Sequence, residues 1–314
     1  MIGELAVFYL FLGGVGAGTV AVCSLADLLW VRRPFGSTAL VHKPSVAAEA
    51  RTLDYGFLAG LIILATGTAC LVLDLGRADR VLTLFLAPRL SVMSVGAYAL
   101  LSLLVLGAFL VLTSLFYLPE ISRRVVSAAE IAAIIIGVAV MVYTGVLLAT
   151  VGGVSLWWSA LLPALFLLSS VSGGIAVVLA LSAVAEDCPR LATLSRNLAL
   201  IDMAVIALEV LVAAAFLWES ARDPNPGTIA GLAILTQGSA AKAWWLGFGI
   251  FGLALPLVIE ALTGGFRLLP RRALALAAVA VLLGAFCLRW SVVEAGVHRE
   301  PVLEEPGLEY PFWN

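Results

Sequence analysis

The sequence contains little charge, little cysteine and almost no histidine. Only 12% of its 314 residues are charged, whereas 62% are hydrophobic, and the mean hydropathy is +1.11. Soluble domains are roughly half apolar and about a quarter charged, because their exterior must be wetted. These deficits exclude a cytosolic enzyme, a secreted domain and a nucleic-acid binder. A formal net charge of −2 also argues against a polybasic surface. The composition leaves a multi-spanning membrane protein in contact with the lipid bilayer.

Long apolar runs give the number of spans. A helix needs about 20 mostly apolar residues to cross the hydrocarbon core. The segment 131–185 has no ionisable side chain and is too long for one span, and Gly152, Gly153 and Ser155 predict a turn within it. We therefore predict an all-α integral membrane bundle of eight transmembrane helices, with residues 1–314 as a single domain. The expected spans are 5–30, 55–76, 92–117, 128–150, 157–184, 198–219, 243–263 and 273–295.

The loops indicate the orientation. Eleven Lys and Arg residues fall on the side of the loops after the first, third, fifth and seventh spans, and seven fall on the other side. The excess marks the cytoplasmic side, which places both termini outside the cytoplasm. The first apolar run lacks the basic start and cleavage site of a signal peptide and continues into Asp27, so we expect a true span.

Histidine and cysteine are too few for the usual redox centres. The two histidines, His42 and His298, both fall in predicted loops, which excludes a membrane cytochrome b with axial histidines inside its helices. The cysteines show no CxxC spacing: Cys23, Cys70, Cys188 and Cys287. We expect no haem, no iron–sulfur cluster and no metal in this chain.

Small residues recur at helical spacing in two of the predicted spans. A glycine run at 13–18 superficially resembles a dinucleotide-binding loop, but it follows no strand and lies inside an apolar helix. Residues four apart instead predict close helix packing of the GxxxG kind. The pairs are Gly14/Gly18, Ser169/Gly173 and Ser170/Gly174.

Ionisable residues that interrupt the apolar runs are the candidates for function, because each costs ~2.5–3.5 kcal/mol at a helix centre. Glu4, Asp74, Arg77 and Tyr143 are expected near the outer side, with Arg289 and Glu294 at a similar depth. Asp74 and Arg77 are three apart and either close the helix end as an ion pair or form the polar wall of a pocket. Tyr143 is either an interfacial anchor or a donor to a ligand.

Four carboxylates are expected deeper or on the inner side. Glu209 is near mid-span, where it serves in proton transfer, in a functional ion pair or in a buried structural pair. Asp202 lies one to two turns nearer the cytoplasm. Asp27, like Glu260, is near the inner face and is either an ordinary interface residue or a functional one.

A quinone fits this set of groups. Its carbonyls need hydrogen-bond donors such as Tyr143 and Arg77, its reduction needs a titratable carboxylate, and its tail needs apolar walls. The tryptophans expected in the outer interfacial belt are Trp157, Trp158, Trp244 and Trp245. Transporters also bury carboxylates, so the residues alone leave both classes open.

Seven strings occur in order along nearly the whole chain. They are FYLFLGGVGAGTV (8–20), LVLDLGRADRVLTLF (71–85), PRLSVMSVGAY (88–98), VYTGVLLA (142–149), LWWSALLPALFLLSSVSGGIA (156–176), the stretch 202–209, and LRWSVVEAG (288–296). Together they resemble the NrfD/polysulfide-reductase membrane-subunit family, the quinone-reactive anchors of molybdopterin oxidoreductases.

The resemblance implies an eight-helix subunit of the bacterial inner membrane that does not itself hold the main catalytic centre. It implies electron exchange between menaquinone or ubiquinone and a ferredoxin-like [4Fe–4S] subunit attached to a large molybdopterin subunit. It also implies a quinone site built from Asp74 and Arg77 of the LDLG-R element and Tyr143 of the YTG element, with Glu4 at the start of the first helix. The family pattern can carry a His or Asn near Glu4, and this chain lacks it.

The hypothesis from the sequence is a quinone-reactive membrane subunit that uses Glu4, Asp74, Arg77 and Tyr143 for quinone. Glu209, Asp202 and Asp27 are its candidates for proton transfer. The alternatives are a proton-coupled secondary transporter and a membrane scaffold that does not bind quinone. The sequence shows no paired broken helices in matching halves, which weighs against the transporter.

Overall fold

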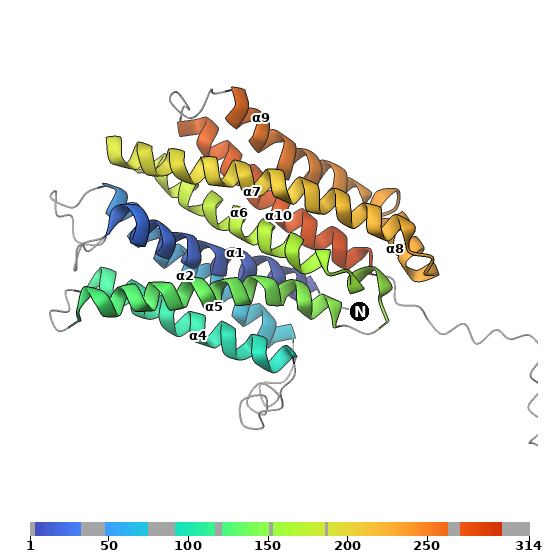
Figure 1. The fold of residues 1–314 in the computed structure, drawn as a ribbon, viewed down its shortest axis with the longest axis horizontal. Coiled ribbons are helices and arrows are strands. Elements are labelled where there is room, and N and C mark those ends of the chain that lie inside the picture. The colour runs from blue at the N-terminus through green and yellow to red at the C-terminus, as the bar shows by residue number, and fades with distance from the viewer. Residues whose placement is uncertain are drawn as a thin grey trace, which may run out of the picture.

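Long helices lie side by side with alternating direction in the computed structural model (Figure 1). The structure describes residues 4–32, 48–74, 92–116, 121–150, 153–185, 188–262 and 271–296. Every regular element in these ranges is a helix. The elements are α1 (Glu4–Ala26), η1 (Asp27–Val31), α2 (Ala48–Asp74), α4 (Val92–Leu115), α5 (Arg123–Ala149), η2 (Ser155–Trp158), α6 (Leu161–Val184), α7 (Pro189–Arg222), α8 (Pro226–Thr236), η3 (Ala243–Ala254), α9 (Leu255–Leu262) and α10 (Arg271–Glu294).

The predicted fold class, an all-helical membrane bundle, is confirmed. Seven of the described helices are long and apolar enough to cross a membrane. The expected span over 243–263 is formed by η3, a π-helix, continued by α9, each shorter than a span alone. The break expected near Gly153 is also present, because α5 ends at Ala149 and α6 begins at Leu161.

Two features of the helices differ from the prediction. Helix α7 runs from Pro189 to Arg222 rather than over 198–219, because its polar ends continue the helix beyond the apolar stretch. Pro189 stands at the first turn, where the missing N–H of proline costs no helical hydrogen bond. Helix α8 lies in a stretch expected to be a loop, since its 11 residues are too few for a span.

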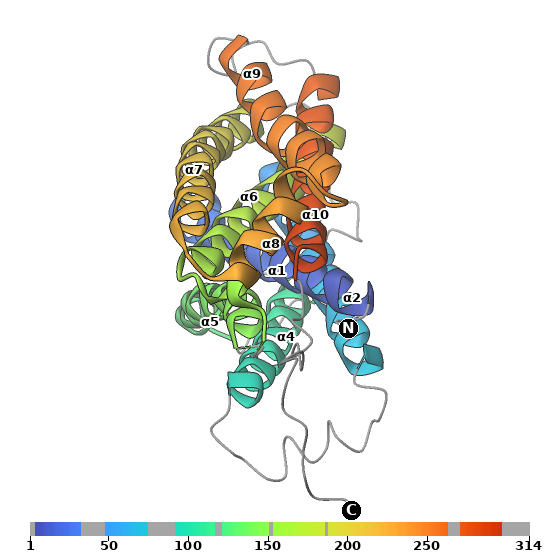
Figure 2. The same ribbon diagram turned by 90° about the vertical axis from the view of Figure 1, so that its right-hand side faces the viewer.

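Helices α1 and α6 form the centre of the bundle. Helix α1 packs against α2, α5, α6 and α10, and α6 packs against α1, α5, α7 and α10. Helices α2, α4 and α5 lie on one side of this central pair, and α7, η3, α9 and α10 lie on the other (Figures 1 and 2). We call the end of the bundle at the start of α1 the Tyr9 end and the opposite end the Asp27 end.

The predicted close packing of small residues is confirmed where α1 crosses α6. A β-carbon added to Gly18 would overlap the backbone carbonyl of Ser170, and one added to Gly174 would overlap the backbone of Gly18. A β-carbon on Gly14 would lie 2.5 Å from the Ser170 hydroxyl oxygen. The small residues therefore set the distance between the two central helices.

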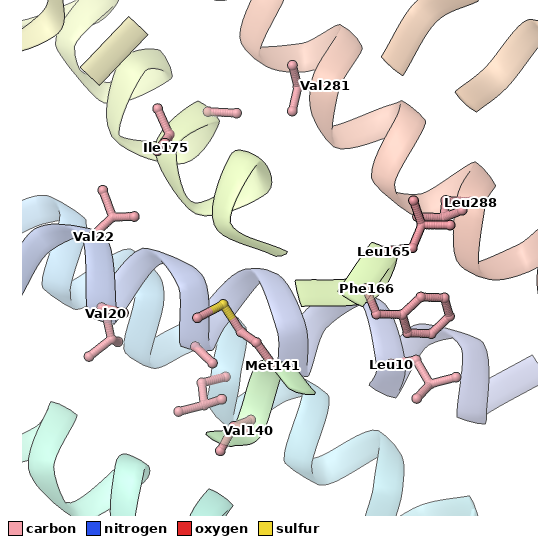
Figure 3. Close-up of a cluster of buried hydrophobic side chains, with 14 of the residues drawn as sticks. Leu10, Val20, Val22, Val140, Met141, Leu165, Phe166, Ile175, Val281 and Leu288 are labelled. Atoms are coloured by element: carbon pink, nitrogen blue, oxygen red, sulfur yellow. The ribbon is translucent and has the colours of Figure 1, made fainter. Parts of the chain in front are cut away.

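Apolar side chains fill the remaining space between the central helices and their neighbours. Figure 3 shows Leu10 of α1, Met141 of α5, Phe166 of α6 and Leu288 of α10 in one cluster of buried side chains. Polar and charged side chains are buried in the same bundle, among them Asp27, Asp202, Glu209 and Arg289.

Candidate functional site

Two phenols face each other between α1 and α5 near the Tyr9 end. Tyr9 is 1% exposed and Tyr143 is 8% exposed. The Tyr9 hydroxyl lies near that of Tyr143 but reaches hydrogen-bond geometry with no group among the described residues. A buried polar group without a partner is rare in proteins, because it loses its hydrogen bonds to water without replacement. The pair therefore offers a buried O–H group to a further acceptor.

Glycines make room for both rings. A β-carbon on Gly96 of α4 would overlap the ring of Tyr143, and one on Gly13 would lie 3.3 Å from the ring of Tyr9. The Tyr143 ring therefore lies directly against the backbone of α4. Three helices, α1, α4 and α5, fix the position of the phenol pair.

This contact gives a testable prediction. We expect Gly96→Ala to displace the Tyr143 ring and lower the free energy of unfolding by about 1–3 kcal/mol, because added volume strains a packed site. Equilibrium unfolding in mixed micelles, followed by tryptophan fluorescence, measures the change. Combining Gly96→Ala with Tyr143→Leu should recover part of the loss, because leucine lacks the ring that the new methyl group meets.

The matched control is Gly107→Ala on the same helix. A β-carbon at Gly107 would meet only side-chain methyl groups, the nearest being Leu61 Cδ1 at 3.3 Å. If the Gly96 and Gly107 variants lost equal stability, the close contact between Gly96 and Tyr143 would be contradicted.

The other residues predicted to bind quinone are placed differently. Asp74 is the last residue of α2 and is exposed. Arg77 and the side chain of Glu4 lie outside the described residues. The shared cluster of Glu4, Asp74 and Arg77 with Tyr143 therefore stays a prediction, and Tyr9 is the group that the structure places beside Tyr143.

Arg289 of α10 is completely buried and joins three helices. It donates five hydrogen bonds, of 2.7 to 3.4 Å, to groups on α1, α6 and α10. The acceptors are the carbonyl oxygens of Leu10, Phe166 and Ala285 and the hydroxyl oxygens of Ser169 and Ser170. Its guanidinium also lies 5.2 Å from the centre of the Phe166 ring. Because Leu10 follows Tyr9, this network holds the turn of α1 that carries the phenol.

Glu209 of α7 is the buried acid nearest in effect to Arg289, although the two groups form no salt bridge among the described residues. The Glu209 carboxyl group lies beside Ser169 and interacts electrostatically with Arg289 and with Asp202. Asp202 precedes it by seven residues, which is two helical turns on the same face. Asp202 lies near Ser172, but its Oδ1 atom has no hydrogen-bond partner among the described groups. Two predicted proton-transfer residues thus lie in one buried polar cluster.

Asp27 belongs to a separate cluster at the other end of the bundle. Its carboxylate is fully buried and accepts a 2.8 Å hydrogen bond from Arg123 of α5, which also lies 3.5 Å from Glu130. Eighteen residues of helix separate Asp27 from Tyr9, which corresponds to about 27 Å along α1. The structure therefore does not bring Asp27 together with the phenol pair.

The predicted tryptophan belt needs a correction. Trp157 and Trp244 are 1% and 2% exposed, so they belong to the core rather than to the membrane interface. The indole of Trp157 donates a 2.9 Å hydrogen bond to the carbonyl of Val292, which provides the polar partner that a buried indole needs. Trp158 and Trp245 are exposed and fit the predicted belt.

Sequence reasoning missed Tyr9 as a functional candidate. The available signal was a tyrosine in the FYLFLGG string, one helical turn before Gly13, whose lack of a side chain leaves space for the ring. The partners of Arg289 gave no such signal, because serines and backbone carbonyls are common in apolar helices.

A long bundle of apolar helices with a buried phenol pair, a buried arginine and two buried carboxyl groups defines a multi-pass membrane protein with polar groups in its interior. The sequence matches the family described as polysulphide reductase, NrfD, over residues 2–299, and the protein belongs to that family. It is 28% identical over 304 residues to one subunit of the polysulfide reductase of Wolinella succinogenes, and the match covers 92% of each of the two sequences.

A second relative matches over a shorter region. The protein NrfD homolog of Haemophilus influenzae is 26% identical over 176 residues, 56% of this chain. The chain spans about half of that relative's length, 54%. The family resemblance predicted from the seven strings is thereby confirmed.

Proposed function

We propose that the chain is the quinone-reactive membrane subunit of a multi-subunit oxidoreductase of the molybdopterin class. Its membership of the polysulphide reductase family supports a membrane subunit of a reductase complex. The observation that carries the quinone site is the buried pair of hydroxyls of Tyr9 and Tyr143, which lie together and of which the Tyr9 hydroxyl forms no hydrogen bond of full geometry among the described residues. Phenol hydroxyls of this kind suit the carbonyl oxygens of menaquinone or ubiquinone.

The chemistry assigned to the chain is binding, orientation and proton handling. The phenols of Tyr9 and Tyr143 donate hydrogen bonds to a quinone oxygen, and the apolar helices hold its isoprenoid tail. Asp74 and Arg77, with Glu4, are the remaining polar groups proposed for the site. The electron chemistry belongs to the quinone and to the partners, a ferredoxin-like [4Fe–4S] subunit and a molybdopterin subunit.

Proton exchange with the quinone needs titratable groups within the bundle. We propose that Glu209 and Asp202 serve this purpose, because both are buried in one cluster that reaches α1 through Arg289. Asp27 is the weaker candidate, since its carboxylate is already bound by Arg123 at the Asp27 end. In the proposed orientation both termini and the phenol pair lie on the outer side of the bacterial inner membrane, where the iron–sulfur partner docks.

The test compares quinol-dependent and dye-dependent turnover of the intact complex. We expect Tyr143→Phe to lower quinol-dependent turnover and quinone-analogue affinity roughly tenfold, because one hydrogen bond to the quinone oxygen is lost. Turnover with a soluble dye that delivers electrons directly to the partner subunits should not change. Tyr55→Phe is the matched control and should behave as the native complex, because Tyr55 is an exposed tyrosine of α2 at the Asp27 end, away from the phenol pair.

Three outcomes would contradict the proposal. Unchanged analogue affinity and turnover in both Tyr143→Phe and Asp74→Asn would overturn the site. Dye-dependent turnover in a native complex that uses no quinol would indicate a scaffold. Uptake of a solute into proteoliposomes by this chain alone would indicate a transporter.

A further inference from the structure

The Tyr9 end of the bundle has a cavity that the proposed function does not use. It has a volume of about 480 Å³ and lies between η2, the last turn of α7 and the start of α8. Its walls include two indoles, of Trp158 and Trp218, and three charged groups, of Glu219, Arg222 and Asp223. Cavities of a few hundred Å³ with a few placed polar groups are typical ligand sites.

The two indoles indicate at which level of the membrane this cavity lies. Trp158 and Trp218 are 64% and 63% exposed, and Trp218 stands where the apolar stretch of α7 gives way to Glu219 and Arg222. Exposed tryptophans at the ends of membrane spans lie at the level of the lipid headgroups. The cavity therefore opens where phospholipid headgroups are concentrated.

The guanidinium of Arg222, the positively charged group in the cavity wall, is available to a ligand. The Arg222 guanidinium stacks 4.2 Å from the centre of the Trp218 ring. Stacking uses the face of the guanidinium and leaves the N–H groups at its edge free to donate. None of the salt bridges formed within the described parts of the chain involves Arg222.

The two carboxylates are held in place by neutral groups. Glu219 accepts a 2.9 Å hydrogen bond from the Ser159 hydroxyl. Asp223 accepts hydrogen bonds from the Thr228 hydroxyl at 2.7 Å and from the Asn225 N–H at 3.0 Å. These two bonds lower the pKa of Asp223 and keep it ionised. A carboxylate has about four acceptor positions, so both acids can still accept from an ammonium group.

We propose that this cavity binds the headgroup of a phospholipid that carries a phosphate next to a primary ammonium, as in phosphatidylethanolamine. The phosphate meets the edge of Arg222, and the ammonium lies between Glu219 and Asp223. A choline headgroup has no N–H to give to the carboxylates. An anionic headgroup without an ammonium brings no positive charge to Glu219 and Asp223, and its own negative charge is repelled by these two carboxylates. The arrangement of one cation and two carboxylates thus selects the zwitterion.

The experiment is performed with the complex reconstituted into nanodiscs of equal phosphatidylethanolamine and phosphatidylcholine, whose retained lipids are then counted by native mass spectrometry. We expect a roughly tenfold preference for phosphatidylethanolamine, the size of one charge-assisted hydrogen bond. The double variant Glu219→Gln, Asp223→Asn should lose this preference while still retaining lipid. Arg222→Gln should lower the retention of both lipids by a similar factor, because both carry the phosphate.

Matched controls are Glu294→Gln, an exposed acid at the same end, and Arg124→Gln, an exposed base at the start of α5. Both should keep the native preference, and circular dichroism should show that all variants are folded. Equal retention of the two lipids by the native complex would overturn the proposal. So would a preference for phosphatidylglycerol in matching nanodiscs of equal phosphatidylethanolamine and phosphatidylglycerol, or binding of added soluble phosphoethanolamine as tight as that of the lipid.

Discussion

Replacing Arg289 by methionine is expected to lower the free energy of unfolding by about 3–5 kcal/mol, because several buried acceptors lose their hydrogen bonds at once and each unsatisfied group costs about 1–3 kcal/mol. The guanidinium is fully buried and donates five hydrogen bonds to α1, α6 and α10. Methionine fills a similar volume but donates none of them. It also removes the positive charge that interacts electrostatically with the buried Glu209. Equilibrium unfolding in mixed micelles, followed by tryptophan fluorescence, measures the loss.

The stability lost in Arg289→Met should depend on the presence of Glu209. In the double variant Arg289→Met, Glu209→Met the unpaired carboxyl group is gone, so we expect it to be more stable than Arg289→Met alone. Arg124→Met provides the control, because Arg124 is exposed and its change should stay within about 0.5 kcal/mol of native stability. Independent, additive effects of the Arg289 and Glu209 substitutions would show that the two groups are not coupled.

The helices could be predicted from the sequence because the bilayer imposes a length. Residues 92–117 were expected to form a span, and α4 covers Val92–Leu115. The same rule misjudged α7, which continues to Pro189 and Arg222, because helix formation does not stop where the apolar stretch ends. It also gave no sign of α8, since 11 residues are below the length that a span requires.

The candidate site could be predicted only in part. Tyr143 was identified from its string and its depth, and the structure places it in a buried pair. Its partner Tyr9 was missed, because which face of α1 meets α5 depends on the crossing of helices far apart in sequence. Depth along the membrane is readable from a single span, whereas the direction in which a side chain points is not.

The same limit explains why the partners of the buried carboxylates could not be predicted from the sequence. The sequence identified Asp27 and Glu209 as unusual, and both are buried. It could not show that Arg123 binds the Asp27 carboxylate or that Arg289 interacts electrostatically with Glu209, because these arginines come from helices remote in the chain. Membrane helices bury such groups only with partners, so the need for partners was predictable while their identity was not.

The second large loss of stability is expected from a substitution where the two central helices, α1 and α6, cross. We expect Gly18→Ala to lower the free energy of unfolding by about 3 kcal/mol, the upper end of the usual range for overpacking. The β-carbon of alanine would meet the Ser170 carbonyl, and a backbone group cannot move aside as the tip of a side chain can. Unfolding in mixed micelles measures the loss.

The substitution should also act on function, because α1 carries Tyr9 on the turn that Arg289 holds through the Leu10 carbonyl. If α1 moves away from α6, the phenol leaves Tyr143 and quinol-dependent turnover falls more than dye-dependent turnover. Gly249→Ala is the control, since the nearest neighbours of its β-carbon would be 3.5 and 4.0 Å away, an ordinary contact. A Gly18 variant as stable as the Gly249 variant would mean that α1 and α6 are not held together by their small residues. A destabilised variant with native quinol turnover would instead separate the helix crossing from the phenol pair.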